Sequence, residues 1–124
     1  MKKRAVVLGS TGSIGRSTLD VLAGMADEWE VVGLAAGSQG AALAEQANHF
    51  RPAMVALAAR AGVGELEGAL AYTPRVLFGS AGLVQLVEDL ECDCLVSAIV
   101  GMEGLAATVR AVELGRRIAL ANKE

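Results

Sequence analysis

Three glycines with hydroxyl residues between them stand near the start of the chain, in the segment GSTGSIG at residues 9–15. An apolar run at 5–8 precedes this segment, and an amphipathic stretch follows it. Where a strand leads through glycines into a helix, free backbone N–H groups and the positive end of the helix dipole face one point, which suits a pyrophosphate. We therefore predict a dinucleotide-binding loop. Gly9 would make the turn, Gly12 would admit the ligand close to the backbone, and Gly15 would allow tight packing of helix on strand.

The residues between the glycines add donors to this predicted loop. Thr11 and Ser13 carry hydroxyls, and Ser13 can also cap the following helix. The segment is not a Walker A loop, because no Gly-Lys-Ser or Gly-Lys-Thr ends it. The alternative is that the glycines serve only a tight turn, but the predicted strand before them and the helix after them favour dinucleotide binding.

The end of the second predicted strand indicates which dinucleotide binds. An NAD site usually has an Asp or Glu there, which holds the ribose 2′-hydroxyl and would repel a 2′-phosphate. This chain has Gly37, Ser38 and Gln39 at that place and no acid. We therefore predict a preference for NADP(H), through small polar donors and backbone N–H groups. The alternative is that Ser38 and Gln39 only solvate a loop.

A polar segment, Asn122-Lys123-Glu124, follows the last predicted strand. A lysine at the ligand-binding edge of a sheet can meet a phosphate or an oxyanion. Polar residues after a strand are also ordinary loop, so the residues alone leave both readings open.

Short apolar runs and amphipathic stretches alternate along the whole chain. This pattern predicts a doubly wound, mainly parallel α/β sheet of the Rossmann type, since no Asn-Gly or Asp-Gly dipeptide indicates a hairpin. In such sheets ligands bind at the carboxyl ends of the strands, where the strand order reverses. The predicted strands are 4–8, 30–36, 53–57, 75–78, 94–100 and 117–121, and the predicted helices are 13–25, 41–50, 65–71, 81–90 and 102–114.

Helical periodicity also predicts which side chains share a face. In the first helix the predicted face carries Ile14, Thr18, Val21, Leu22 and Met25. In the last helix it carries Met102, Leu105, Val109 and Val112, and Gly115 would end that helix.

Composition excludes several classes of protein. The chain has 124 residues, enough for one domain, with a net charge of −3 and 3% aromatic residues. Binding of nucleic acid is not expected, because it requires a concentrated basic surface. No apolar run is long enough for a signal peptide or a membrane span, so we expect a cytoplasmic protein without a membrane partner. Cys92, Cys94 and the single histidine, His49, are expected to have no role in chemistry.

Five stretches together resemble the N-terminal domain of the 1-deoxy-D-xylulose 5-phosphate reductoisomerase family. They are GSTGSIG, residues 17–21, Ala36-Gly37, residues 98–101 and the terminal LANKE at 120–124. The resemblance runs from the first strand to the last residue.

The resemblance implies particular contacts. NADPH would be bound by Thr11, Gly12, Ser13 and Ile14 in the first loop, by Gly37, Ser38 and Gln39 at the adenosine ribose phosphate, and by Asn122 and Glu124. Ile99 and Val100 would lie beside the nicotinamide, and Lys123 would touch the sugar phosphate. Family members commonly carry Asn at the place of Gln39, often after a basic residue, so this chain departs from the family where the 2′-phosphate would bind.

The resemblance also implies a reaction. The family rearranges and reduces 1-deoxy-D-xylulose 5-phosphate to 2-C-methyl-D-erythritol 4-phosphate, an oxidoreductase step of the non-mevalonate isoprenoid pathway that uses NADPH and a divalent Mg²⁺ or Mn²⁺. The metal ligands and catalytic residues of the family lie downstream of the LANKE segment. Residues 1–124 are therefore expected to be an NADPH-binding fragment without a metal site or catalytic residues. The fragment would be inactive by itself, and the full-length protein would be a homodimer.

The residues alone leave two other functions open. Another NADP-dependent dehydrogenase, such as a semialdehyde dehydrogenase, would keep its nucleophile beyond this region. A non-catalytic nucleotide-sensing module is the second alternative, although such modules usually keep the acid for NAD. A short-chain reductase is excluded, because Tyr72 lacks a lysine four residues later.

Overall fold

The computed structural model describes residues 1–99, 102 and 104–120. Within these residues, strands and helices alternate along the chain. In chain order the elements are β1 (Lys3–Leu8), α1 (Ser13–Gly24), β2 (Trp29–Ala36), α2 (Gly40–Phe50), β3 (Met54–Leu57), the 3₁₀ turn η1 (Arg60–Gly62), α3 (Val63–Ala69), β4 (Arg75–Phe78), α4 (Gly79–Asp89), β5 (Cys94–Ser97), α5 (Leu105–Glu113) and β6 (Ile118–Leu120).

The strands form one parallel sheet in the order β4-β3-β2-β1-β5-β6. The chain moves outward from β1 to β4 and then returns to the other side of β1 with β5. The strand order therefore reverses between β1 and β5, which is where such folds bind ligands. The predicted doubly wound, mainly parallel α/β fold of the Rossmann type is confirmed.

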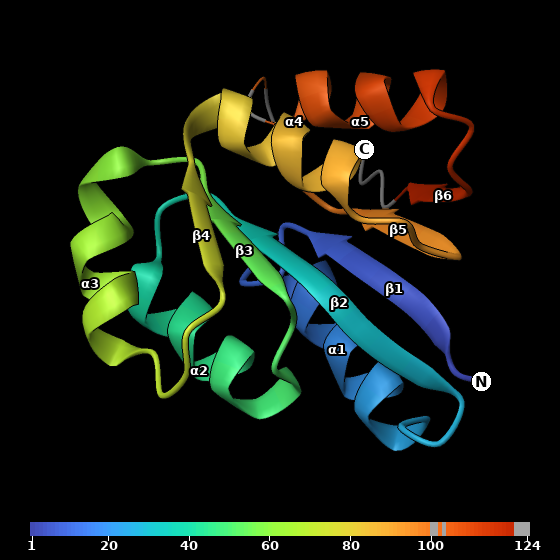
Figure 1. Ribbon diagram of the computed structural model, residues 1–124, viewed down its shortest axis with the longest axis horizontal. Helices are drawn as coiled ribbons and strands as arrows, with labels where there is room; N and C mark the ends of the chain where they lie inside the picture. The colour runs from blue at the N-terminus through green and yellow to red at the C-terminus, as the bar shows by residue number, and fades with distance from the viewer. Residues whose placement is uncertain (100–101, 103, 121–124) are drawn as a thin grey trace.

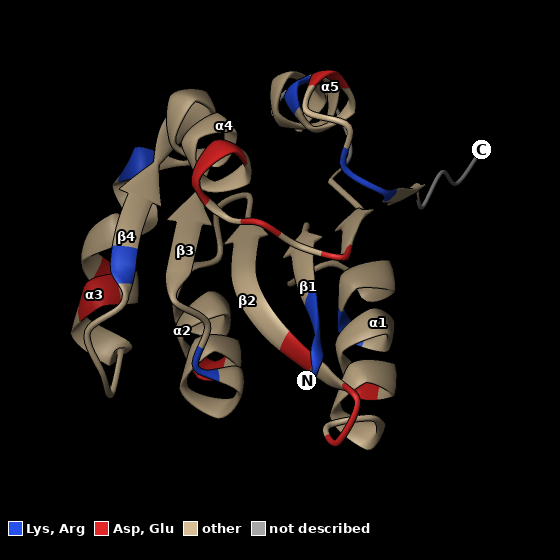
Figure 2. Ribbon diagram, turned by 45° about the vertical axis from the view of Figure 1, so that its right-hand side comes forward, with Lys and Arg blue, Asp and Glu red and all other residues tan. Residues whose placement is uncertain are grey.

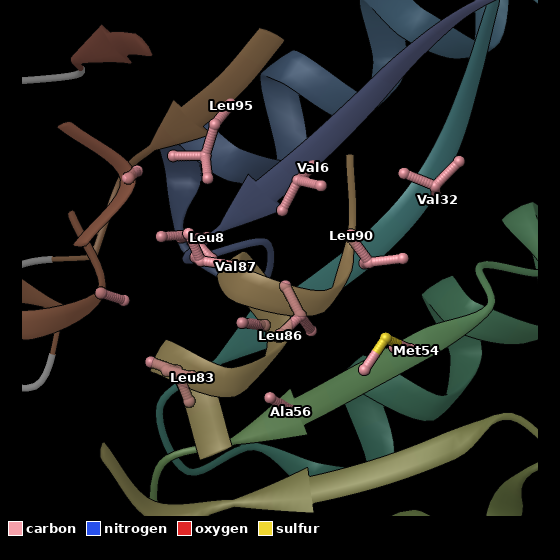
Figure 3. Packing of buried hydrophobic residues seen from close by; sticks show 13 residues of the cluster. Val6, Leu8, Val32, Met54, Ala56, Leu83, Leu86, Val87, Leu90 and Leu95 are labelled. Atoms are coloured by element: carbon pink, nitrogen blue, oxygen red, sulfur yellow. The ribbon is translucent and has the colours of Figure 1, made fainter. Parts of the chain in front are cut away.

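Helices cover both faces of the sheet (Figure 1). Helices α1, α2 and α3 pack on one face, and α4 and α5 pack on the other. Each face has its own hydrophobic core. Successive residues of β1 point to opposite faces, so Val7 belongs to the core under α1, α2 and α3, while Val6 and Leu8 belong to the core under α4 and α5. Figure 3 shows the side chains of α4 lying over strands β1 and β3. Burial on both faces explains the continuous apolar runs that the sequence shows.

The predicted face of the first helix is only partly right: Leu22 is partly buried and packs against the core, but two other residues of that face are exposed. Ile14 and Val21 are 43% and 61% exposed, whereas Gly15 and Leu19 are buried. The cause is Gly15, whose missing side chain lets α1 press against the preceding loop: a Cβ there would lie 2.0 Å from the carbonyl oxygen of Gly9. That contact sets the rotation of the helix and turns Leu19, one turn later, toward the sheet.

The predicted face of the last helix is wrong. Leu105 and Val112 are 51% and 63% exposed, and the buried residues of α5 are Ala107 and Ala111. These two alanines are four residues apart on one side of the helix, and small side chains let the helix lie close to its neighbours.

Most other predicted elements agree with the structure to within two residues. β5 ends earlier than expected, at Ser97, and α5 begins later, at Leu105. The turn η1 was not predicted.

Charged residues of both signs are interspersed over the described part of the chain (Figure 2). None of the helices described here is long and apolar enough to cross a membrane.

Candidate functional site

The loop after β1 lies at the reversal point of the sheet. Gly9 has φ +85°, and the N–H groups of Gly9 and Ser10 both donate to the carbonyl oxygen of Ala35, at 2.7 and 3.0 Å. A Cβ on Gly9 would lie 2.5 Å from the carbonyl carbon of Ala98, just beyond β5. Glycine is therefore required at this position both for the turn and for the close approach of the two segments.

Gly12 differs from the other two glycines of the loop. Its φ of −78° suits any residue, and a Cβ there would have only one neighbour within 4 Å, the Gly9 carbonyl oxygen at 3.6 Å. No described contact explains why position 12 lacks a side chain. The space that a side chain would fill lies in front of the first turn of α1 and is open to a ligand.

The first turn of α1 presents unpaired donors to this space. The helix-forming hydrogen bonds begin with the N–H of Arg16, which donates to the Gly12 carbonyl oxygen at 2.9 Å. Among the described residues, the N–H groups of Ser13, Ile14 and Gly15 have no acceptor. The helix is capped by Gly12 and has no side-chain cap. The expectation that Ser13 caps the helix is therefore wrong, because Ser13 is already its first residue, and its exposed hydroxyl is free for a ligand.

Two side chains that the sequence did not single out hold the loop. Arg16 Nε donates to the carbonyl oxygen of Thr11 at 2.8 Å, and Gln46 Nε2 donates from α2 to that of Ser10, also at 2.8 Å. Gln46 is 36 residues from Ser10 in the chain. No local pattern indicates such a contact.

The segment after β2 forms a second part of the same edge. Gly37 follows the strand, and its carbonyl oxygen accepts a hydrogen bond from Ala59 N–H at 2.8 Å. Ser38 and Gln39 are exposed, and Gln39 caps α2. The structure thus leaves both side chains exposed at this edge, and their contact with the adenosine end of the cofactor stays a prediction.

The end of β5 forms the third part. The backbone nitrogen of Ile99 would lie 2.7 Å from a Cβ on Gly9, so Ile99 adjoins the glycine loop. Gly104 fits against the Ile99 side chain, since a Cβ on Gly104 would be 2.6 Å from that of Ile99. The predicted residues Val100, Asn122, Lys123 and Glu124 lie outside the described residues.

These three segments line one edge of the sheet, with the glycine loop between the end of β5 and the end of β2. That is the shape a dinucleotide requires, with its pyrophosphate at the helix and its two ends on either side. The donor set and the open space at Gly12 fit NADPH. No carboxylate occurs in residues 9–15 or 36–40 to repel its phosphates.

The two cysteines lie away from this edge, at the amino end of β5. Burial raises the pKa of the Cys92 thiol, which lies just before the amino end of β5, at the opposite edge of the sheet. This shift favours the unreactive thiol over the thiolate. Within the described part of the chain, no three His, Cys, Asp or Glu side chains gather to hold a metal ion.

Known proteins are similar to this chain in sequence and in fold. The profile of the 1-deoxy-D-xylulose 5-phosphate reductoisomerase family matches residues 5–124. Relatives of that name include those of Rippkaea orientalis, 42% identical over 98% of this chain; Synechocystis, 43% over 100%; and rice, a chloroplastic form, 44% over 95%. The chain spans 31%, 32% and 26% of the length of these relatives, respectively.

Solved structures of reductoisomerases are also similar to this chain. The reductoisomerase of Zymomonas mobilis in complex with NADPH superposes with a TM-score of 0.91 at 33% identity, over 98% of this chain and 32% of that one. A reductoisomerase in complex with NADPH, fosmidomycin and magnesium superposes with a TM-score of 0.86 at 31% identity, over 97% of this chain and 30% of that one.

Proposed function

Because the chain belongs to the 1-deoxy-D-xylulose 5-phosphate reductoisomerase family, we propose that residues 1–124 form the NADPH-binding domain of such an enzyme. The whole protein would rearrange and reduce 1-deoxy-D-xylulose 5-phosphate to 2-C-methyl-D-erythritol 4-phosphate. The chain spans less than a third of its relatives, so the metal ligands and the catalytic residues would belong to the remainder.

One observation carries the cofactor proposal: Gly12 lacks a side chain for no reason internal to the described chain, and unpaired N–H groups open onto the space it leaves. The amides of Ser13 and Ile14 would donate to the pyrophosphate, assisted by the hydroxyls of Thr11 and Ser13 and by the helix dipole. Bound there, the pyrophosphate would replace water as the partner of these groups.

NADPH, when bound, supplies the hydride of the reduction. The chain's own residues would position it. Gly37, Ser38 and Gln39 would hold the adenosine ribose phosphate through backbone and side-chain donors. Ile99 and Val100 would give the nicotinamide an apolar wall that excludes water, and Asn122 and Glu124 would fix its orientation. Lys123 would attract the phosphate of the substrate, since an ammonium group is a point donor for phosphate.

The remaining properties of the whole protein are part of the same proposal. It would require Mg²⁺ or Mn²⁺ held by hard oxygen ligands. It would act in the cytoplasm on a small sugar phosphate, without nucleic acid or membrane partners, and as a homodimer.

The test is a titration of the 124-residue chain with NADPH and with NADH, following nicotinamide fluorescence, after circular dichroism has established that the chain is folded. We expect saturable NADPH binding that is at least about tenfold tighter than NADH binding, equal to about 1.4 kcal/mol. Gly12→Val should abolish it, while Gly24→Ala, a helical glycine with nothing within 4 Å of its Cβ position, should leave it unchanged. A folded chain that binds neither cofactor would overturn the proposal.

A second experiment tests the reaction. The chain is joined in frame to the remainder of the Synechocystis relative, with which it shares 43% identity. We expect NADPH oxidation that depends on both 1-deoxy-D-xylulose 5-phosphate and Mg²⁺. A folded chimera that binds NADPH but leaves it unoxidised would limit this chain to nucleotide binding.

A further inference from the structure

The adenosine end of the candidate site has no cation of its own in the loop after β2, where Ser38 and Gln39 are neutral. The neighbouring strand supplies one. Beyond the end of β3 the chain continues to follow β2, because Ala58 N–H donates to the carbonyl oxygen of Ala36 at 2.9 Å and Ala59 N–H to that of Gly37 at 2.8 Å. The next residue is Arg60.

Two glycines then press the turn η1 against this loop. A Cβ on Gly62 would lie 2.9 Å from the Ser38 carbonyl oxygen, and one on Gly40 would lie 2.4 Å from the Gly62 carbonyl oxygen. The backbone that carries Arg60 is therefore in direct contact with the backbone that carries Ser38.

The Arg60 side chain is exposed and has an apolar support. Its guanidinium carbon lies 4.9 Å from the centre of the Phe78 ring, and Phe78, 44% exposed, is the last residue of β4 and so lies on the same edge of the sheet. Stacking on one ring face leaves the guanidinium N–H groups free at its rim.

Two other arginines of the described chain are paired with carboxylates. Arg75 forms an ion pair with Asp89 at 2.8 Å, and Arg110 forms one with Glu88 at 2.8 Å. Among the residues the structure describes, no carboxylate pairs with Arg60.

We propose that Arg60, held against Phe78 at the end of β3, binds the 2′-phosphate of NADPH and sets the preference for NADPH over NADH. The inference rests on the proposed function. A guanidinium presents two parallel N–H donors to a phosphate, which is a stronger and more directional contact than a hydroxyl or amide can give. The charge would thus reach the 2′-phosphate from the β3 side, whereas a basic residue at position 38 would reach it from the β2 side.

The test compares Arg60→Ala and Arg60→Lys with the unsubstituted chain, using the dissociation constants of NADPH and NADH and of the fragments 2′,5′-ADP and 5′-ADP. Arg60→Ala should raise the dissociation constants of NADPH and 2′,5′-ADP by about tenfold or more, and it should change those of NADH and 5′-ADP by less than about twofold. Arg60→Lys should keep part of the preference, because it retains the charge but loses the planar fork.

Arg16→Ala is the matched control. Arg16 is also exposed, but its guanidinium donates to the Thr11 carbonyl oxygen in the pyrophosphate loop. Loss of this side chain should therefore weaken the binding of NADPH and of NADH by the same factor. Ser38→Arg introduced into the Arg60→Ala variant should restore the preference from the opposite side of the phosphate.

The outcomes separate the two proposals. If the folded chain binds no nucleotide, both fail. If it binds NADPH and Arg60→Ala weakens NADPH and NADH equally, the guanidinium contacts the adenine and not the 2′-phosphate, and the Arg60 proposal alone fails. A folded Arg60→Ala variant whose dissociation constants for NADPH and NADH are both unchanged would also overturn the Arg60 proposal.

Discussion

The three glycines of the first loop are the same residue type but have different physical roles. Gly9 and Gly15 are required by contacts within the chain, whereas Gly12 is not. The pattern of glycines predicted the loop, because each role depends on a local spacing. The support from Gln46 could not be predicted, since a glutamine in a helix carries no sign of a partner 36 residues away.

This difference predicts opposite results for one change at two positions. Gly15→Ala should destabilise the fold by about 3 kcal/mol or more, because the methyl group would overlap the backbone of Gly9. Gly12→Ala should cost at most about 1 kcal/mol, the difference between the two residues as helix caps, yet weaken NADPH binding. Urea denaturation and cofactor titration measure both. Equal losses of stability would contradict the assigned roles.

At the scale of the elements, periodicity located the helices but misplaced the buried face of α5 and part of that of α1. Both helices carry large apolar side chains outside and pack through small residues or one leucine. Counting apolar residues therefore selects the wrong side. In α2 and α4, by contrast, the large apolar residues Leu43, Leu83 and Leu86 are the buried ones.

The rotation of α1 can be measured directly. Leu19 is 3% exposed and Val21 61% exposed, although the sequence pattern favoured Val21 as the core residue. Leu19→Ala should lower the free energy of unfolding by about 2–4 kcal/mol through lost burial and the cavity left behind. Val21→Ala should change it by less than about 0.5 kcal/mol. Denaturant titration of the two variants would contradict the observed rotation if their order were reversed.

At the scale of the whole molecule, the alternation of strand and helix was enough to predict the sheet, because buried parallel strands leave a continuous apolar signal. The approach of β3 to the loop after β2, which brings Arg60 to the candidate site, left no such signal. It depends on the order of strands in space. The predicted contacts of Val100, Asn122, Lys123 and Glu124 stay predictions.

The single tyrosine gives the fold a dependence on alkaline pH. The Tyr72 hydroxyl donates to the Pro52 carbonyl oxygen at 2.7 Å, and burial raises the pKa of Tyr72 to about 12, against a smaller opposing effect of Arg51. Between about pH 10 and 12 the unfolded chain loses this proton before the native one does. The native state then holds more protons, so its stability decreases as pH rises.

Tyr72→Phe isolates this contribution. At pH 7 the variant should be less stable by about 1 kcal/mol, the value of the lost hydrogen bond. Above pH 10 its stability should fall less steeply than that of the unsubstituted chain. Urea denaturation at pH 7 and pH 11 gives both quantities, and tyrosinate absorbance of the folded protein reports the pKa itself. Parallel slopes would show that Tyr72 ionises equally in both states.

The contact of Gly9 with Ala98 also bears on the order of events in folding. β1 and β5 are neighbours in the sheet, yet the hydrogen bond from Arg4 N–H to Asp93 beside them spans 89 residues of chain. Pairings of such long range close large loops and form late. A nucleotide therefore has no complete site to bind until the two halves of the chain have met, and the appearance of cofactor binding during refolding would time the last large step of assembly.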